Sequence, residues 1–144
     1  MKKRLGFLLI LGLLTSCGSS IPSEERSAVQ TAMKYYQTLF IQRDYLGAQQ
    51  MMDESFKAAL TMTKMKELSE QYNVSFGEML EYKVEFYELQ KDPSRLMVFI
   101  KTENKKTTLY HRVFIVMAGG RNYIDGFVFR DRPYPGSPTR KAFK

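Results

Sequence analysis

The sequence predicts an α+β domain in which N-terminal helices pack on one face of a curved, four-stranded antiparallel sheet. In the first half of the domain, apolar residues recur at the three- and four-residue spacing of amphipathic helices. After Gly77 they alternate with polar residues in four stretches, separated by turn residues at Pro93, Asn104 and Gly119-Gly120. Helices followed by consecutive hairpins are typical of an α+β domain with its helices gathered on one side of the sheet.

Residues 1–16 have the layout of a secretory signal peptide. Lys2, Lys3 and Arg4 form a cationic head, and an apolar run follows at residues 5–14. The run is too short for a transmembrane helix, because crossing the hydrocarbon core takes about 20 apolar residues. It also lacks the polar face that a helix of a soluble domain would present.

This leader ends in Leu14-Thr15-Ser16-Cys17, which resembles the lipobox of bacterial lipoproteins. The resemblance implies cleavage before Cys17, a diacylglycerol thioether on its sulfur and acylation of the new amino terminus; two or three acyl chains anchor a protein stably. The expected location is therefore a bacterial cell membrane. Where the host has an outer membrane we expect its periplasmic face, because Gly18 replaces the aspartate associated with inner-membrane retention. The alternative is a free thiol beside an ordinary signal cleavage site.

Residues 17–23 form a short linker, because Gly18–Ser23 are mostly small or polar and reach about 20 Å at most. Three helices are then expected: one from about 24 to 43, a shorter one capped by Asp44, and a third capped by Thr63. A loop or single turn lies between the last two, around residues 53–60. Their apolar stripes, which we interpret as core, contain Val29, Met33, Tyr36, Phe40, Tyr45, Ala48, Met51, Met52, Met65, Leu68 and Tyr72.

Two-residue loops at Asn104-Lys105 and Gly119-Gly120 set a register for the last two hairpins of the sheet. The alternating stretches are residues 79–89, 95–103, 107–118 and 122–129. In this register one face, assigned to the helices, collects Leu96, Val98, Ile100, Leu109, His111, Val113, Ile115, Met117, Ile124 and Val128. The other face collects Met97, Phe99, Tyr110, Arg112, Phe114, Val116, Tyr123, Asp125, Phe127 and Phe129. A one-residue slip of either hairpin would exchange the faces.

The second, aromatic face is the candidate binding surface. A sheet that is apolar on both faces is covered on both, or it exposes a patch that has a role. Arg112 and Asp125 are diagonal neighbours on this face and can form an ion pair. The candidate binding residues are Tyr110, Arg112, Phe114, Tyr123, Asp125, Phe127 and Phe129.

The domain ends near residue 130, and residues 131–144 form a basic tail. Pro133, Pro135 and Pro138 remove backbone donors and fix φ, so an extended, flexible segment is expected. The simplest interpretation is a solvated end. The alternative is a cationic arm that touches anionic lipid, cell-wall polymer or a partner protein.

The formal net charge of +7 suggests nucleic-acid binding at first sight, but the charges are at the two ends of the chain. Three positive residues leave with residues 1–16. Residues 130–144 hold five basic residues and a single acidic one, so the remaining segment, 17–129, is formally neutral. We therefore expect no nucleic-acid partner.

The order of elements resembles the nuclear-transport-factor-two-like superfamily, whose members are cone-shaped, with helices packed on a curved sheet. The residues that carry the resemblance are Arg43-Asp44-Tyr45-Leu46-Gly47-Ala48 between the first two helices and Ile124-Asp125-Gly126-Phe127 near the end. Asn122 stands where the family commonly has tryptophan. The superfamily includes isomerases, dehydratases, hydrolases and non-catalytic binders, so the resemblance does not decide function.

Two hypotheses follow. The first is a non-catalytic, lipid-anchored envelope domain that binds a partner protein, a second copy of itself or an apolar ligand through the aromatic face. The second is a small pocket enzyme of isomerase, dehydratase or hydrolase type that uses His111 or Asp125 as acid or base. No metal or other cofactor is expected, because one cysteine and one histidine are too few ligands and no glycine-rich phosphate loop is present.

Overall fold

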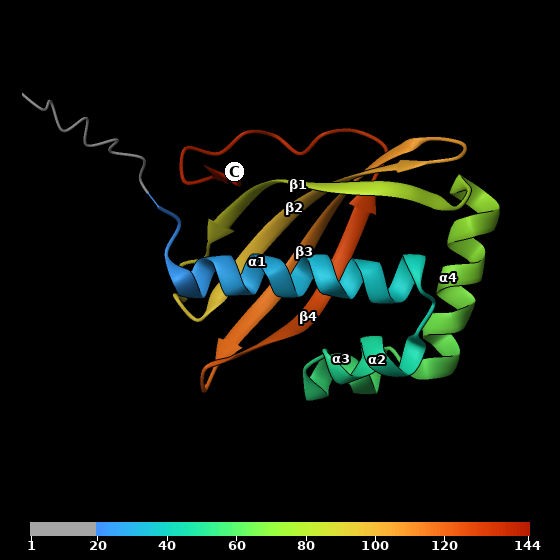
Figure 1. Ribbon diagram of the computed structural model, residues 1–144, viewed down its shortest axis with the longest axis horizontal. Coiled ribbons are helices and arrows are strands. Elements are labelled where there is room, and N and C mark those ends of the chain that lie inside the picture. The colour runs from blue at the N-terminus through green and yellow to red at the C-terminus, as the bar shows by residue number, and fades with distance from the viewer. Residues whose placement is uncertain (1–19) are drawn as a thin grey trace, which may run out of the picture.

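A computed structural model describes residues 20–144, and the predicted leader with Cys17 lies outside them. Helices come first and strands afterwards, which confirms the α+β fold class (Figure 1). The helical elements are α1 (Ser23–Tyr36), the π-helical η1 (Gln37–Ile41), α2 (Tyr45–Gln50), α3 (Glu54–Ala59) and α4 (Met62–Phe76). The strands are β1 (Met79–Leu89), β2 (Arg95–Asn104), β3 (Thr108–Ala118), β4 (Arg121–Arg130) and β5 (Lys141–Ala142).

The long first helix predicted at about 24–43 consists of α1 continued by η1. In the wider π-helical turn the Gln42 N–H donates to the Gln37 carbonyl, and the Asp44 N–H donates to the Thr38 carbonyl, both at 2.9 Å. Phe40, in this turn, is 5% exposed and belongs to the core.

Side-chain caps set where the later helices begin. Asp44 caps α2 as predicted, and Asp53 caps α3, so the segment around 53–60 is a helical turn rather than a loop. The prediction that Thr63 caps the next helix is wrong: Thr61 accepts the capping bond, and α4 begins at the residue after it. Both threonines precede the same apolar stripe, so the pattern alone did not separate them.

The strands form one antiparallel sheet in the order β4-β3-β2-β1-β5, so the four predicted strands are extended by a short fifth. α1 lies across one face, which we call the inner face, and α4 stands at one end of the sheet (Figure 1). The free edge of β4 is held by the chain between α2 and α3. There the Asp53 N–H donates to the Ile124 carbonyl, and the Ile124 N–H donates to the Met51 carbonyl.

The turn between β2 and β3 lies one residue later than predicted. Lys105-Lys106 form the two-residue loop, rather than Asn104-Lys105, because the Asn104 N–H donates to the Thr107 carbonyl. Each β2 residue is therefore opposite a β3 residue two positions later than expected. Since side chains alternate with a period of two, this shift leaves the predicted faces of β2 and β3 unchanged.

A β-bulge in β4 changes the predicted faces. The loop at Gly119-Gly120 is confirmed, with positive φ at both glycines, and the predicted pairing holds as far as Ile115 opposite Ile124. Phe114 then lies opposite Gly126, so Asp125 is an extra residue in β4. Every side chain after Asp125 is consequently on the opposite face from the one predicted.

The correction concerns three residues. Phe127 and Phe129, expected on the outer face, are opposite Val113 and His111 and pack against the core. Val128, expected on the inner face, is 44% exposed on the outer face. The core therefore has an aromatic end, formed by residues of the helices and of β4, in addition to the aliphatic inner face of β2 and β3.

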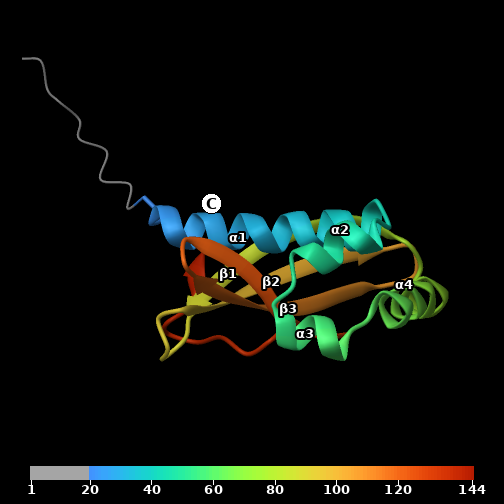
Figure 2. The same cartoon turned by 90° about the horizontal axis from the view of Figure 1, so that it is seen from below.

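The C-terminal strap, which we define as residues 131–144, differs from the free extension expected. It runs back along the side of the sheet opposite α1 (Figures 1 and 2). β5 pairs with Phe86 and Tyr87 of β1, and the Lys141 ammonium lies 3.3 Å from the Glu25 carboxylate in α1. The C-terminus is thus fixed beside the start of α1. Within residues 20–144 no helix is long and apolar enough to cross a membrane.

Candidate functional site

His111 is the first candidate, and its imidazole is 0% exposed on the inner face. Nδ1 lies 2.8 Å from the Tyr36 hydroxyl, and Nε2 lies 3.0 Å from Oγ1 of Thr102. Aromatic rings enclose the group, with centroid distances of 5.1 Å to Tyr36 and 5.3 Å to Phe129. The histidine is therefore part of a buried polar network inside an aromatic shell.

One assignment of hydrogens satisfies this network with a neutral imidazole. The Tyr36 O–H donates to Nδ1 of His111, and Nε2–H donates to Thr102 Oγ1, whose own hydrogen goes to the Leu109 carbonyl. The Asn104 amide also donates to Thr102 Oγ1. A second proton on Nδ1 would turn the Tyr36 hydroxyl away from its acceptor and place an unpaired charge in the core.

Burial therefore lowers the pKa of His111 from 6.5 to about 3. The same burial raises the pKa of Tyr36 well above 10. An acid or base near neutral pH needs a pKa near the working pH and contact with its substrate. The pKa of His111 is far below neutral and its side chain is 0% exposed, so its geometry is that of a structural group.

Asp125, the second candidate, lies at the bulge of β4 and points to the outer face. Its carboxylate forms an ion pair with Arg95 at 2.5 Å, and not with Arg112 as predicted. The bulge moves Asp125 out of register with β3, toward the start of β2. The carboxylate is on a sheet surface, where an ion pair is the ordinary arrangement for such a group.

The bulge divides the predicted binding residues. Tyr110, Arg112, Phe114 and Tyr123 lie on the outer face with Asp125, whereas Phe127 and Phe129 lie on the inner face. The structure thus brings five of the seven together.

Sequence reasoning missed two groups that the strap adds to the outer face. Tyr134 packs on Phe99 with ring centroids 5.9 Å apart. The guanidinium of Arg140 lies 3.8 Å above the Phe99 ring and 5.7 Å from that of Phe86. The proline-rich composition of the strap suggested an extended backbone, but no local pattern showed where that backbone returns.

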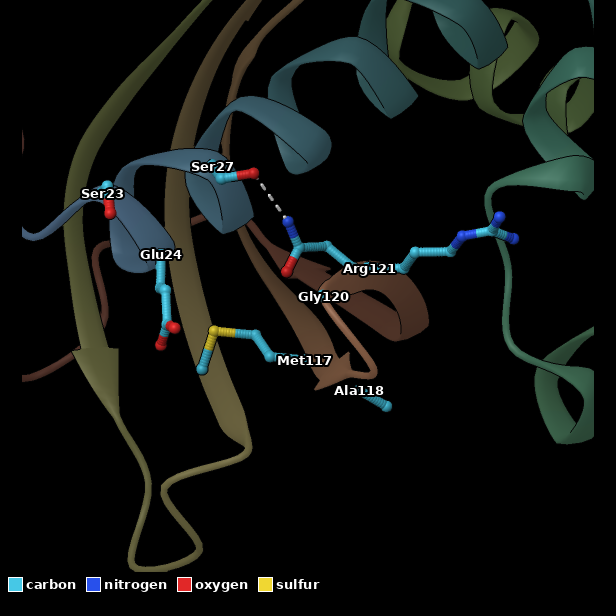
Figure 3. A pocket seen from close by; sticks show the side chains of 8 residues that line it. Ser23, Glu24, Ser27, Met117, Ala118, Gly120 and Arg121 are labelled. Atoms are coloured by element: carbon cyan, nitrogen blue, oxygen red, sulfur yellow. Dashed lines mark hydrogen bonds between the residues drawn. The ribbon is translucent and has the colours of Figure 1, made fainter.

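The pocket in Figure 3, of about 340 Å³, lies between the start of α1 and the β3–β4 hairpin. Ser27 and Asn122 line it and are joined by a 2.9 Å hydrogen bond from the Asn122 amide to the Ser27 hydroxyl. Asn122 thus ties β4 to α1. Of the predicted site residues that the structure describes, none lines this pocket.

Among residues 20–144, no group of three or more histidine, cysteine, aspartate or glutamate side chains is placed to hold a metal ion. Cys17 is outside the described residues. Comparison of the chain with protein-family models, with curated proteins and with solved structures found no match.

Proposed function

We propose that this chain is a lipid-anchored protein of the bacterial cell envelope whose α+β domain binds a partner through the outer sheet face. The anchoring half rests on Leu14-Thr15-Ser16-Cys17 and on the short Gly18–Ser23 linker. For the domain the proposal is membership of the nuclear-transport-factor-two-like superfamily, and the order of helices followed by consecutive antiparallel strands supports it.

One observation carries the choice of binding over catalysis. Both titratable candidates are committed to structural partners: His111 to the enclosed network with Tyr36 and Thr102, and Asp125 to Arg95. The outer face, by contrast, keeps aromatic and apolar groups near the surface, including Val128 at 44% exposure. Exposed patches of this composition are typical of interaction sites.

Lipidation is tested by labelling cells with a palmitate analogue during expression of the full chain. Wild type is expected to take up the label and to fractionate with membranes, and Cys17→Ala to do neither. Ser19→Ala, a small polar position just beyond the expected cleavage site, is the matched control and should behave as wild type. Equal labelling of Cys17→Ala and wild type would remove the anchoring half of the proposal.

Partner binding is tested with a photo-crosslinking amino acid placed in the same cells at one exposed position. An adduct of defined mass is expected from Val128 on the outer face. Val74 of α4, which is 74% exposed, is the control and should give none. Absence of any adduct from Val128, or the same adduct from both positions, would contradict binding through the outer face.

A further inference from the structure

The outer face carries an excess of positive charge that the fold concentrates there. Arg130 and the strap hold five basic residues and one acidic residue, whereas residues 17–129 are formally neutral. Because the strap packs on the outer face and its end is fixed by β5, Arg130 and Arg140 are held against the sheet, whereas Lys141 pairs with Glu25 of α1. Part of the charge excess of the sequence thus becomes a surface property of one face.

Three arginines gather around two rings on this face. The guanidinium carbons of Arg112 and Arg130 lie 4.4 Å and 4.9 Å from the centroid of Tyr134. Arg140 lies 3.8 Å above Phe99, which is the cross-strand partner of Arg112. Stacking on aromatic rings fixes a guanidinium in orientation and leaves its N–H edges available to a planar anion.

These arginines have no carboxylate within ion-pair distance among residues 20–144. The Nε atoms of Arg112 and Arg140 are also buried without a hydrogen-bond partner. Glu85 lines a cavity of about 50 Å³ together with Arg140 beneath the strap. Asp125, on the same face, is already neutralised by Arg95. The arrangement holds unpaired positive charge at fixed positions.

Apolar residues continue the surface beside the arginines. Phe114 lies 5.9 Å from the Arg112 guanidinium, and Val128 is the cross-strand neighbour of Arg112 in β4. Arginine, tyrosine and phenylalanine are enriched at the energetic centres of protein interfaces. Arginine forks also bind carboxylates with two parallel hydrogen bonds, which a compact lysine ammonium cannot do.

From these contacts we infer that the partner of the outer face is a protein segment rich in aspartate or glutamate, bound by Arg112, Arg130 and Arg140. This inference deepens the proposed binding role and rests on it. The acidic side chains meet the free guanidinium edges, while apolar groups of the segment pack on Phe114 and Val128.

The test uses the unlipidated chain from residue 18 onward, which contains every residue described in the structure. The probe is a fluorescein-labelled peptide of ten glutamates, followed by fluorescence anisotropy in 50 mM NaCl. Wild type is expected to bind, and Arg112→Gln/Arg130→Gln to bind at least about 10-fold more weakly, since close charge pairs contribute strongly across an interface. Binding should also weaken in 500 mM NaCl.

Two variants control the experiment. Lys34→Gln/Lys64→Gln removes two exposed charges from α1 and α4, and should change affinity by less than about 2-fold because these charges are on the helical side. Arg112→Lys/Arg130→Lys keeps the positive charge but removes the planar guanidinium groups, so it should bind the peptide with intermediate affinity. If circular dichroism shows that Arg112→Gln/Arg130→Gln is unfolded, the lysine double variant replaces it in the comparison.

Three results would overturn the inference: no binding of the peptide to wild type, equal losses in the outer-face and helical-side pairs, or binding only to phosphatidylglycerol vesicles. Self-association of the chain that displaces the peptide would assign the face to a second copy instead. Because the chain here is unlipidated, these failures leave the palmitate labelling and the Val128 crosslinks standing. Failure of the proposed function is therefore distinguishable from failure of this inference.

Discussion

Acid should weaken this fold through His111. The folded chain keeps the imidazole neutral, with a pKa of about 3, whereas in the unfolded chain the pKa is near 6.5. Below pH 6.5 the unfolded state therefore binds a proton that the native state does not. Because stability rises with pH wherever the unfolded state binds more protons, the contribution of His111 is fully present above pH 6.5 and is lost as pH falls toward 3.

The magnitude follows from these two pKa values. The loss is about 1.4 kcal/mol for each pH unit between them. Relative to pH 8, the free energy of unfolding should fall through His111 by about 1.4 kcal/mol at pH 5.5 and by about 2.7 kcal/mol at pH 4.5. This is a large fraction of the stability of a typical small domain.

The assay is urea unfolding of the wild type and of His111→Gln at pH 8, 5.5 and 4.5, followed by circular dichroism. Carboxylates also titrate in this range, but they are the same in both proteins, so the difference between the two free energies isolates the imidazole. The variant loses a packed ring and is less stable at pH 8. Its deficit should shrink by the amounts above as the pH falls.

A deficit that stays constant from pH 8 to pH 4.5 would refute the reasoning, because it would mean that His111 titrates alike in both states. Nuclear magnetic resonance of the wild type gives an independent measurement. The ring hydrogens of His111 should keep their neutral chemical shifts down to pH 4.5. A titration midpoint near pH 6.5 in the folded protein would contradict the enclosed network.

The remaining predictions concern single contacts. Thr61→Ala should lower the free energy of unfolding by about 0.5–2 kcal/mol, and Thr63→Ala by less than about 0.5 kcal/mol, because only Thr61 caps α4; equal losses in urea unfolding would contradict this. Tyr36→Phe should lower the free energy of unfolding by about 1–3 kcal/mol, because it leaves the buried Nδ1 of His111 without a hydrogen-bond donor. An unchanged urea midpoint would argue against the hydrogen bond from Tyr36 to His111. Deleting the strap uncovers Phe99, so binding of a hydrophobic fluorescent dye should increase; an unchanged signal would mean that the strap does not cover it.

The strands were predictable because a sheet that is covered on one face needs apolar residues at every second position. That alternation is visible in the sequence. The turn at Gly119-Gly120 was predictable because both residues need a positive φ, which glycine adopts without strain. The wrong position of the turn at Asn104-Lys105 did not change which residues were assigned to each face. It displaces the pairing of β2 with β3 by two residues, which preserves the alternation of side chains.

The bulge at Asp125 caused the main error in the predicted site, because it places Phe127 and Phe129 in the core and not on the predicted binding surface. One signal was present: Gly126 interrupts the strand pattern, and an isolated glycine inside a strand often marks a bulge. The strap gave no comparable signal. Its contacts join Tyr134 to residues of β2, β3 and β4 that are adjacent only after the sheet has formed.

The strap also constrains how the proposed anchor and the proposed partner are arranged. It crosses the outer face and ends at β5, where Lys141 contacts Glu25 near the start of α1. An anchor at Cys17 would reach this start through Gly18–Ser23, a span of about 20 Å at most. The arginine face would then be held close to the membrane, because the strap ties it to the anchored end. A partner that satisfies Arg112 and Arg130 must therefore present its acidic segment within the same layer above the membrane. A second protein attached to that membrane meets this condition more readily than one diffusing freely, since attachment raises its effective concentration at this height.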